Sequence, residues 1–137
     1  MTDLPFRVLP ALDDDNRFFW TSGEEGVLRF LRCQGCGYWL HPPGPRCPSC
    51  GGRELAPEQV AGVAEVASFT VNHQSWDGST EPYVIALVEL PEQQGLRLTT
   101  NIVGVEPDEV AIGMQVQVVF EHHDPVWIPV FTPAVGA

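Results

Sequence analysis

Four cysteines constrain this chain more than any other feature of its sequence. They form two C-x2-C pairs separated by ten residues and confined to one eighteen-residue window. Each pair suits a tight knuckle in which backbone N–H groups point at thiolate sulfur, and two knuckles joined by a hairpin present four sulfurs to one Zn2+ at about 2.3 Å. The spacing therefore predicts a zinc ribbon over residues 27–56. The expected metal ligands are Cys33, Cys36, Cys47 and Cys50.

Other uses of these thiols are weaker. Two disulfides would need an oxidising compartment, and the N-terminus has no basic-then-apolar signal peptide. A redox C-x-x-C site normally occurs once, at a helix start in an α/β setting. A rubredoxin-type iron site uses the same four-sulfur geometry, so iron stays open beside zinc. Either ion would be structural, because four protein ligands leave no coordination position for water or substrate. His41, in the intervening loop, is expected to be an ordinary loop residue and not a fifth ligand.

Charge and composition exclude several functions. The 137-residue chain carries 18 acidic residues against seven arginines, a formal net charge of −11, and it has no lysine. A P-loop, a Schiff-base aldolase site and a pyridoxal-phosphate site each need a lysine side chain. A groove for single-stranded nucleic acid needs a basic track, so we expect no nucleic-acid partner. No apolar run approaches the roughly 20 residues of a membrane span, and we expect a cytoplasmic protein without a membrane partner.

Residues 57–137 have the composition of a small β-domain. Glycine and proline are frequent, and alternating or β-branched stretches predict short strands with one helical turn at 106–110. The expected strands are 62–71, 83–90, 96–103, 115–121 and 127–131. Pro129 weakens the last strand to an edge position. Five strands with one interposed helical turn predict a Greek-key barrel of the OB type, so the fold class is mainly β, with a five-stranded OB-fold barrel after the ribbon.

Residues 1–26 are predicted to form an N-terminal helical arm. The aspartates at 13–15 precede an aromatic stretch, which is typical of a helix N-terminus where carboxylates cap free N–H groups. Gly23 and Gly26 are expected to end the helix. A helix this short is marginal alone, so it must dock on the core of this chain or on a partner. The candidate partner-binding residues of the arm are Phe18, Phe19 and Trp20.

Two further groups invite a functional interpretation. His122, His123 and Asp124 resemble a general base with an orienting carboxylate, but a solvated strand-end loop is favoured. Trp76, in the loop after the first barrel strand, is predicted with equal weight to face a ligand or partner or to fold back onto its barrel. No residue is predicted to be catalytic, because the carboxylates are scattered and no thiol is spare.

The ordered motifs of the chain resemble the DUF35 family. They are Phe18-Phe19-Trp20, Gly26-Val27-Leu28, Cys33-x-x-Cys36-Gly37, Pro42-Pro43, Cys47-Pro48-x-Cys50-Gly51, Gly62-Val63-Ala64, Phe69-Thr70-Val71, Pro82-Tyr83-Val84 and Ile112-Gly113-Met114-x-Val116. The resemblance covers residues 12–133 and implies an N-terminal helical stretch, a rubredoxin-like zinc ribbon and a C-terminal OB-fold. We therefore expect an arm over 1–26, a ribbon over 27–56 and a barrel over 57–137.

The resemblance also implies a non-catalytic accessory role in acyl-CoA metabolism. Members of the family occur beside, or fused to, thiolase-like enzymes or hot-dog-fold enoyl-CoA hydratases. Some pair with thiolase-fold aldolases that remove a steroid side chain by retro-aldol cleavage of a CoA thioester. For this chain the resemblance implies a heteromeric complex in which a thiolase-fold subunit supplies the catalytic groups. The alternatives are an accessory domain of a hot-dog-fold hydratase, a nucleic-acid-binding OB-fold protein, and an independent enzyme built on residues 122–124.

Overall fold

Strands make up most of the regular structure of this chain. The computed structural model describes residues 9–73 and 81–134. In chain order the elements are α1 (Arg17–Thr21), the 3-10 turn η1 (Ser22–Glu25), β1 (Leu28–Cys33), β2 (Trp39–Leu40), β3 (Leu55–Val60), β4 (Val63–Asn72), β5 (Tyr83–Glu89), β6 (Arg97–Ile102), the 3-10 turn η2 (Pro107–Glu109), β7 (Gln115–His123) and β8 (Val126–Pro133). The predicted mainly β fold class is confirmed.

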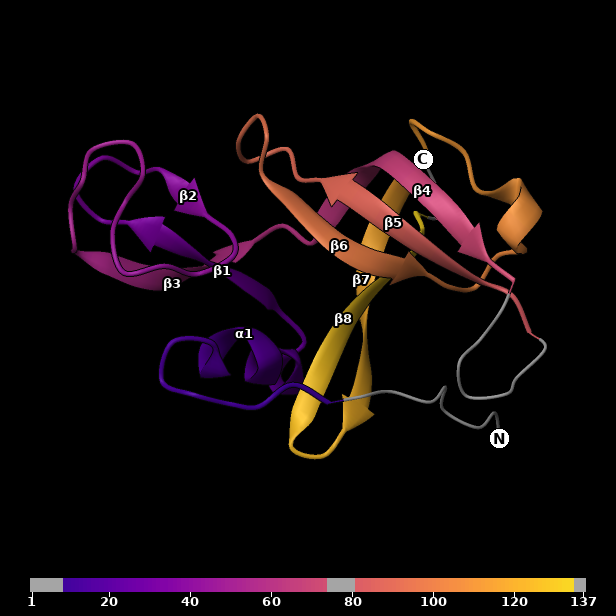
Figure 1. Ribbon diagram of the computed structural model, residues 1–137, viewed down its shortest axis with the longest axis horizontal. Coiled ribbons are helices and arrows are strands. Elements are labelled where there is room, and N and C mark those ends of the chain that lie inside the picture. The colour runs from indigo at the N-terminus through magenta and orange to yellow at the C-terminus, as the bar shows by residue number, and fades with distance from the viewer. Residues whose placement is uncertain (1–8, 74–80, 135–137) are drawn as a thin grey trace.

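The strands form a small antiparallel sheet and a closed barrel, which lie side by side in Figure 1. The small sheet has the order β2-β1-β3, and the barrel has the order β4-β5-β6-β8-β7. Each barrel strand lies within two residues of its expected bounds at either end. Alternation explains the barrel core, since Val84, Ala86 and Val88 of β5 all point inward and are buried. The five-stranded OB-fold barrel is therefore confirmed.

The expected edge position of the last strand is wrong. β8 lies between β6 and β7 and closes the barrel, pairing with β7 from Val116↔Pro133 to His123↔Val126. β8 meets β6 in parallel at Ile102↔Phe131, two residues beyond Pro129. The proline therefore lies outside the pairing with β6, and its missing N–H costs no ladder bond on that side.

The described helical part of the N-terminal arm runs from Arg17 to Glu25 and ends at one of the two expected glycines. Gly26 adopts a left-handed φ of 75° after η1, where glycine carries no steric penalty. Gly23 lies inside η1 and does not end a helical element. It is needed for close packing, because a Cβ there would lie 2.5 Å from the Phe120 ring and 2.6 Å from Trp127 Cβ. The arm is thus held directly against the β7–β8 hairpin, as Figure 1 shows.

The aspartates before α1 cap a turn and not the helix itself. The N-cap residue of α1 is Asn16, and its side chain makes no capping bond. Asp13 Oδ1 instead accepts hydrogen bonds from the backbone N–H groups of Asp15 and Asn16, each at 2.9 Å. Asn16 Oδ1 accepts the N–H of Asp13 in return, also at 2.9 Å. This reciprocal pair fixes the turn that leads into α1.

Arm, ribbon and barrel share one hydrophobic core. Phe19 of α1 and Phe30 of β1 belong to the same buried cluster as Val88 and Phe131 of the barrel. Phe30 and Phe131 are completely buried. Such a continuous core holds the ribbon and barrel in one arrangement, because neither could separate without exposing large aromatic side chains.

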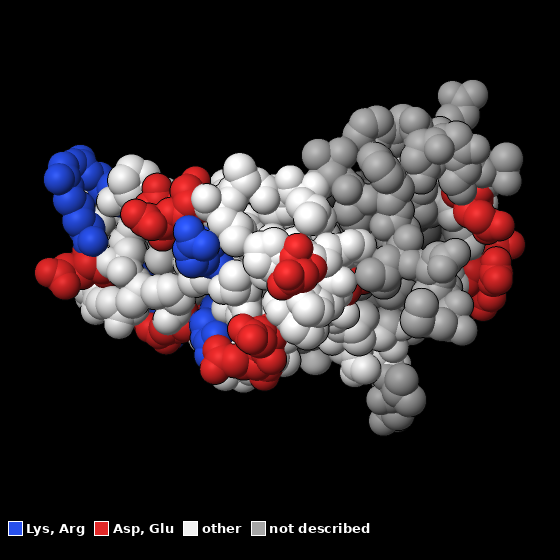
Figure 2. All heavy atoms as spheres, turned by 90° about the horizontal axis from the view of Figure 1, so that it is seen from below, with Lys and Arg blue, Asp and Glu red and all other residues white. Residues whose placement is uncertain are grey.

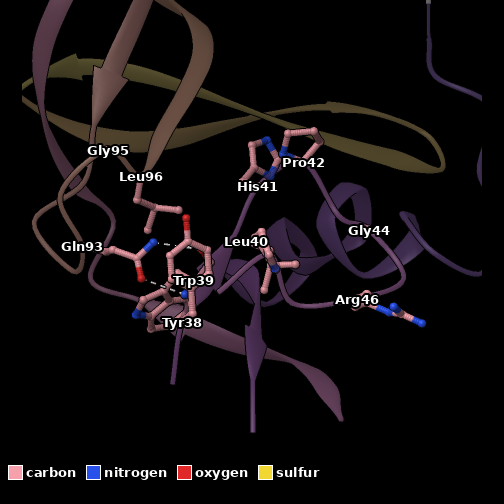
Figure 3. A pocket seen from close by; sticks show the side chains of 11 residues that line it. Tyr38, Trp39, Leu40, His41, Pro42, Gly44, Arg46, Gln93, Gly95 and Leu96 are labelled. Atoms are coloured by element: carbon pink, nitrogen blue, oxygen red, sulfur yellow. Dashed lines mark hydrogen bonds between the residues drawn. The ribbon is translucent and has the colours of Figure 1, made fainter. Parts of the chain in front are cut away.

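A polar clamp joins the ribbon to the barrel beside this core. Gln93, in the loop between β5 and β6, accepts the backbone N–H of Trp39 at 2.9 Å and donates to its carbonyl at 3.0 Å (Figure 3). The adjacent Glu92 accepts the backbone N–H of Ala61 at 2.7 Å, in the link between β3 and β4. One barrel loop therefore fixes both the short ribbon strand and the connection between ribbon and barrel.

Replacing Gln93 with alanine is expected to lower the free energy of unfolding by about 2 kcal/mol. The variant leaves the N–H and carbonyl of Trp39 without their partner, and unsatisfied buried polar groups are costly. Chemical denaturation followed by tryptophan fluorescence measures the change. Gln94→Ala is the matched control, because the neighbouring Gln94 is exposed. Equal stability of the two variants would contradict this role for Gln93.

Candidate metal centre

The two cysteine pairs fold into two knuckles of the same form. The carbonyl of the first cysteine accepts the N–H of a glycine four residues later, Gly37 to Cys33 and Gly51 to Cys47, each at 2.9 Å. Both glycines have left-handed φ angles, 83° and 78°. Only glycine adopts this conformation without strain, which explains the C-x-x-C-G repeat of the sequence.

Backbone N–H groups converge on the sulfurs in both knuckles. Cys47 Sγ accepts from Ser49 and Cys50 at 3.4 and 3.5 Å, and Cys50 Sγ accepts from Gly52 at 3.4 Å. In the first knuckle the backbone N–H groups of Cys36 and Gly35 lower the pKa of Cys33 by hydrogen bonding to its sulfur, and the N–H of Tyr38 does the same for Cys36. Hydrogen bonds from amide N–H groups stabilise a thiolate relative to a thiol, so the backbone of each knuckle favours the anionic form of its cysteines.

The separation of the sulfurs fits a four-coordinate metal. The Sγ atoms of Cys33 and Cys50 lie 3.6 Å apart, as do those of Cys36 and Cys47, and all four lie within 4.8 Å of one another. A tetrahedron with metal–sulfur bonds of about 2.3 Å has edges of roughly 3.8 Å. A disulfide needs about 2.05 Å between sulfurs, so the two-disulfide alternative does not fit this arrangement.

The electrostatics of the four thiols also favour a bound cation. The N–H of Cys36 is the largest influence on Cys33 and helps to lower the pKa of its thiol to about 6. For Cys36 the N–H of Tyr38 lowers the pKa, but burial and the other three cysteines outweigh it and raise the pKa to about 12. Crowded sulfurs thus resist complete ionisation unless a divalent ion neutralises them. The donor set and its geometry fit a structural metal.

Arg32 contacts the first knuckle through Gly37, a contact that the sequence pattern did not predict. Its Nε donates to the Gly37 carbonyl at 2.9 Å, its guanidinium lies 4.5 Å from the centre of the Trp39 ring, and it pairs with Glu58 at 3.3 Å. These contacts join β1, β2 and β3. Only the register of the ribbon sheet, which places Arg32 opposite Trp39, brings them together.

His41 is not a member of the cysteine cluster. Its ring stacks on Phe30 with centroids 4.6 Å apart and lies 4.9 Å from the Phe19 ring. Its Nδ1 is buried, with no hydrogen-bond partner among the described residues. Burial lowers the pKa of His41 from its ordinary 6.5 to about 4. The histidine is therefore a neutral packing residue between arm and ribbon.

This burial predicts a loss of stability as pH falls. The pKa of His41 is lower in the folded chain than in the unfolded chain. Between about pH 6.5 and pH 4, His41 is therefore protonated in the unfolded chain and neutral in the folded chain, and lowering the pH favours unfolding. At pH 5.5 the cost is about 1.4 kcal/mol. We expect His41→Phe to lose less stability than the native chain between pH 7.5 and 5.5, measured by thermal unfolding. Replacing the exposed His73 by Gln is the control, and an unchanged pH dependence in His41→Phe would contradict the prediction.

Residues 122–124 lie at the end of the β7–β8 hairpin, without a hydrogen bond between His122 and Asp124. His122 and His123 belong to strand β7 and not to a loop, because the β7–β8 ladder continues to the tight turn at Asp124. His122 stacks on Trp127, and its Nε2 lies 3.9 Å from Asp124 Oδ1, beyond hydrogen-bond distance. His123 instead approaches Glu121 at 3.4 Å. These contacts are those of a hairpin end.

The candidate partner-binding aromatics are divided by the fold. Phe19 is buried, with 4% of its surface exposed, and packs inside the shared core. Phe18 and Trp20 are half-buried against the same core, so part of each remains accessible. Trp76 lies outside the described residues. No described helix is long and apolar enough to cross a membrane.

Comparison with known proteins agrees with this architecture. Residues 20–56 match the family model described as ChsH2, rubredoxin-like zinc ribbon domain, and residues 57–121 match ChsH2, C-terminal OB-fold domain. A solved structure titled Ltp2-ChsH2(DUF35) aldolase superposes with a TM-score of 0.82 at 43% identity, covering 93% of this chain and 100% of that chain.

Three curated relatives extend the comparison. A probable enoyl-CoA hydratase alpha subunit of Thermomonospora curvata is 43% identical over 94% of this chain and 40% of its own length. A DUF35 domain-containing scaffold protein of Methanocaldococcus jannaschii is 38% identical over 71% of this chain and 70% of its own length. A 3-oxo-4,17-pregnadiene-20-carboxyl-CoA hydratase alpha subunit of Mycobacterium tuberculosis is 36% identical over 81% of this chain and 35% of its own length.

The chain thus spans about two fifths or less of the two hydratase subunits that it matches, but most of the scaffold protein. The two family models follow each other along the chain in the order of the ribbon and the barrel. Ribbon, barrel and relatives agree: this chain belongs to the DUF35 family and has the zinc-ribbon and OB-fold domains of the ChsH2 type.

Proposed function

We propose that this chain is a non-catalytic accessory subunit of a thiolase-fold acyl-CoA enzyme, most specifically an aldolase that cleaves a steroid side-chain CoA thioester by a retro-aldol reaction. The observation that carries the proposal is the match to the DUF35 chain of an aldolase complex over the full length of that chain. The pregnadiene carboxyl-CoA named for one relative supports a steroid thioester as substrate class. The partner subunit supplies the catalytic groups.

The chemistry of the described residues supports a role without catalysis. Cys33, Cys36, Cys47 and Cys50 are proposed to hold one Zn2+, which as a closed four-sulfur site stabilises the ribbon and offers no position for a substrate. The histidines of the β7–β8 hairpin make stacking and carboxylate contacts within the hairpin. The chain therefore contributes structure and contact surface, in a heteromeric complex, to a partner that performs the reaction.

The test compares cleavage of a steroid side-chain β-hydroxyacyl-CoA by three samples: the thiolase-fold partner alone, this chain alone, and the two together. The partner is chosen by co-expressing thiolase-fold proteins of the same genome with this chain. We expect at least tenfold more cleavage with both proteins than with the partner alone, and none with this chain alone. Activity of this chain alone would overturn the proposal, as would a partner whose activity and solubility do not change.

A second candidate is an accessory domain of a hot-dog-fold enoyl-CoA hydratase. The names of two relatives favour it, since both are hydratase alpha subunits and the chain matches only part of each. The same co-expression with hot-dog-fold hydratases distinguishes the candidates. Hydration of an enoyl-CoA that depends on this chain would support the second, and stimulated retro-aldol cleavage alone would support the first.

A further inference from the structure

A hollow lies where arm, ribbon and barrel meet. It has a volume of about 680 Å³ and is lined by the turn before α1, by the ribbon loop at His41–Pro43 and by Arg97–Thr99 of β6. A smaller hollow of about 210 Å³ lies over Thr99–Asn101 and the β8 residues Ile128 and Pro129. Phe19, Trp20, Leu98 and Thr99 line both hollows, so the two adjoin at these residues. We call the adjoining hollows the Trp20 groove.

Trp20 is a preorganised contact residue in this groove. Its ring meets the buried Phe19 ring edge to face, with centroids 4.8 Å apart and an interplanar angle of 86°. Phe19 is in turn held against Phe30 and His41. The indole of Trp20 therefore packs against a buried aromatic cluster that fixes its position, while part of the indole stays accessible. Half-buried tryptophans in fixed positions are frequent energetic centres of protein interfaces, and their faces attract cationic side chains.

The charges around the groove favour a cationic occupant. Asp13 and Asp15 line the larger hollow and are exposed, and the Asp13–Asn16 turn holds its own position through reciprocal hydrogen bonds. The arginine of the opposite wall, Arg97, is already paired with Glu89 at 2.8 Å. Arg97 thus already has a carboxylate partner other than Asp13 and Asp15. On the face that carries α1, several groups of acidic side chains are visible, with basic side chains between them in the ribbon half (Figure 2).

We propose that the Trp20 groove receives an arginine or lysine side chain from a surface segment of the thiolase-fold partner. The aliphatic part of that side chain packs against Trp20, and its charged end lies between the carboxylates of Asp13 and Asp15. This inference rests on the proposed function for the class of partner. It adds the place of contact and the chemistry that recognises it, and it explains how a chain of net charge −11 without lysine selects its partner.

The experiment measures the affinity of the full chain for the thiolase-fold partner identified by co-expression, by calorimetry at 50 and 300 mM NaCl. Asp13→Asn with Asp15→Asn removes two charges and keeps the Oδ1 acceptor that caps the turn. We expect it to weaken binding at least tenfold at low salt and to flatten the salt dependence. Asp108→Asn with Glu109→Gln, in the exposed turn η2, is the control with the same change of charge.

A second variant tests the groove without touching the turn. Thr99 is exposed on β6 and lines both hollows, so Thr99→Arg places a cation of this chain where the partner's is proposed. We expect at least a tenfold loss of affinity with an unchanged melting temperature. Trp20→Ala is expected to weaken binding at both salt concentrations, because its packing contribution is not screened.

The outcomes separate this inference from the proposed function. If the native chain binds none of the thiolase-fold proteins, the proposed function falls and the groove proposal falls with it. If the native chain binds but the aspartate pair and Thr99→Arg behave like the η2 control, the groove proposal alone is overturned. It is also overturned if the native chain dimerises in sedimentation and only Thr99→Arg abolishes the dimer, since the occupant would then be a second copy.

Discussion

Removal of the metal is expected to unfold residues 27–56 and to weaken the packing of the N-terminal arm against them. Metal binding to four-cysteine sites of this kind is itself folding free energy, of order 10 kcal/mol in isolated zinc-finger peptides. Beside the sulfurs the described part of the ribbon has a small apolar cluster, Leu31, Leu40 and Leu55 with two of the cysteines, so packing alone gives this end of the ribbon little support. Elemental analysis of native protein should give about one zinc per chain.

The consequence of metal loss is measured by limited proteolysis and near-ultraviolet circular dichroism after treatment with a chelator. Addition of Zn2+ should restore both signals. Cys47→Ser, which removes a buried thiol proposed to bind the metal, is expected to behave like the chelated protein. Ser49→Ala is the matched control in the same knuckle, since only the backbone N–H of Ser49 serves the sulfur. A metal-free chain that keeps its ribbon, or four thiols paired as disulfides, would contradict the prediction.

Phe30→Ala is expected to lower the free energy of unfolding by about 3–5 kcal/mol, as for other large aromatic residues removed from cores. Phe30 is completely buried and contacts both Phe19 of the arm and His41 of the ribbon loop. Because arm, ribbon and barrel share this cluster, the cavity weakens all three together.

Urea unfolding monitored by circular dichroism and by tryptophan fluorescence measures this loss. The control is Val119→Ala, which removes apolar atoms from a side chain that is 37% exposed on the outer face of β7. We expect less than about 1 kcal/mol from the control. A comparable value for Phe30→Ala would mean that the ribbon and arm do not depend on the shared core.

Local rules account for what could be predicted from the sequence. The C-x-x-C-G repeat implies the knuckles directly, because glycine after the second cysteine permits the left-handed turn that closes each one. Alternation and β-branched residues likewise placed the barrel strands within two residues, since the inward face of each strand must be apolar. The closed barrel with its 3-10 turn at Pro107–Glu109 follows from the same pattern. In each case the information lies within a few neighbouring residues.

The features that local patterns could not predict depend on contacts between distant residues. Which of the three arm aromatics turns inward, Phe19, was fixed by packing against Phe30 and the barrel, and no local pattern distinguishes it from its neighbours. β8 pairs with a strand on each side because the barrel is closed. The preference of proline for edge strands is a local rule and does not account for barrel closure. Gln93 meets Trp39 across 54 positions of sequence, and the Trp20 groove exists only because three separate segments converge. Composition and spacing were enough to predict the cluster of four cysteines and the barrel, because both rest on short-range geometry. The clamp, the shared core and the groove depend on how the complete elements pack against one another. Their formation is governed by contacts between residues far apart in the sequence, which local patterns do not describe.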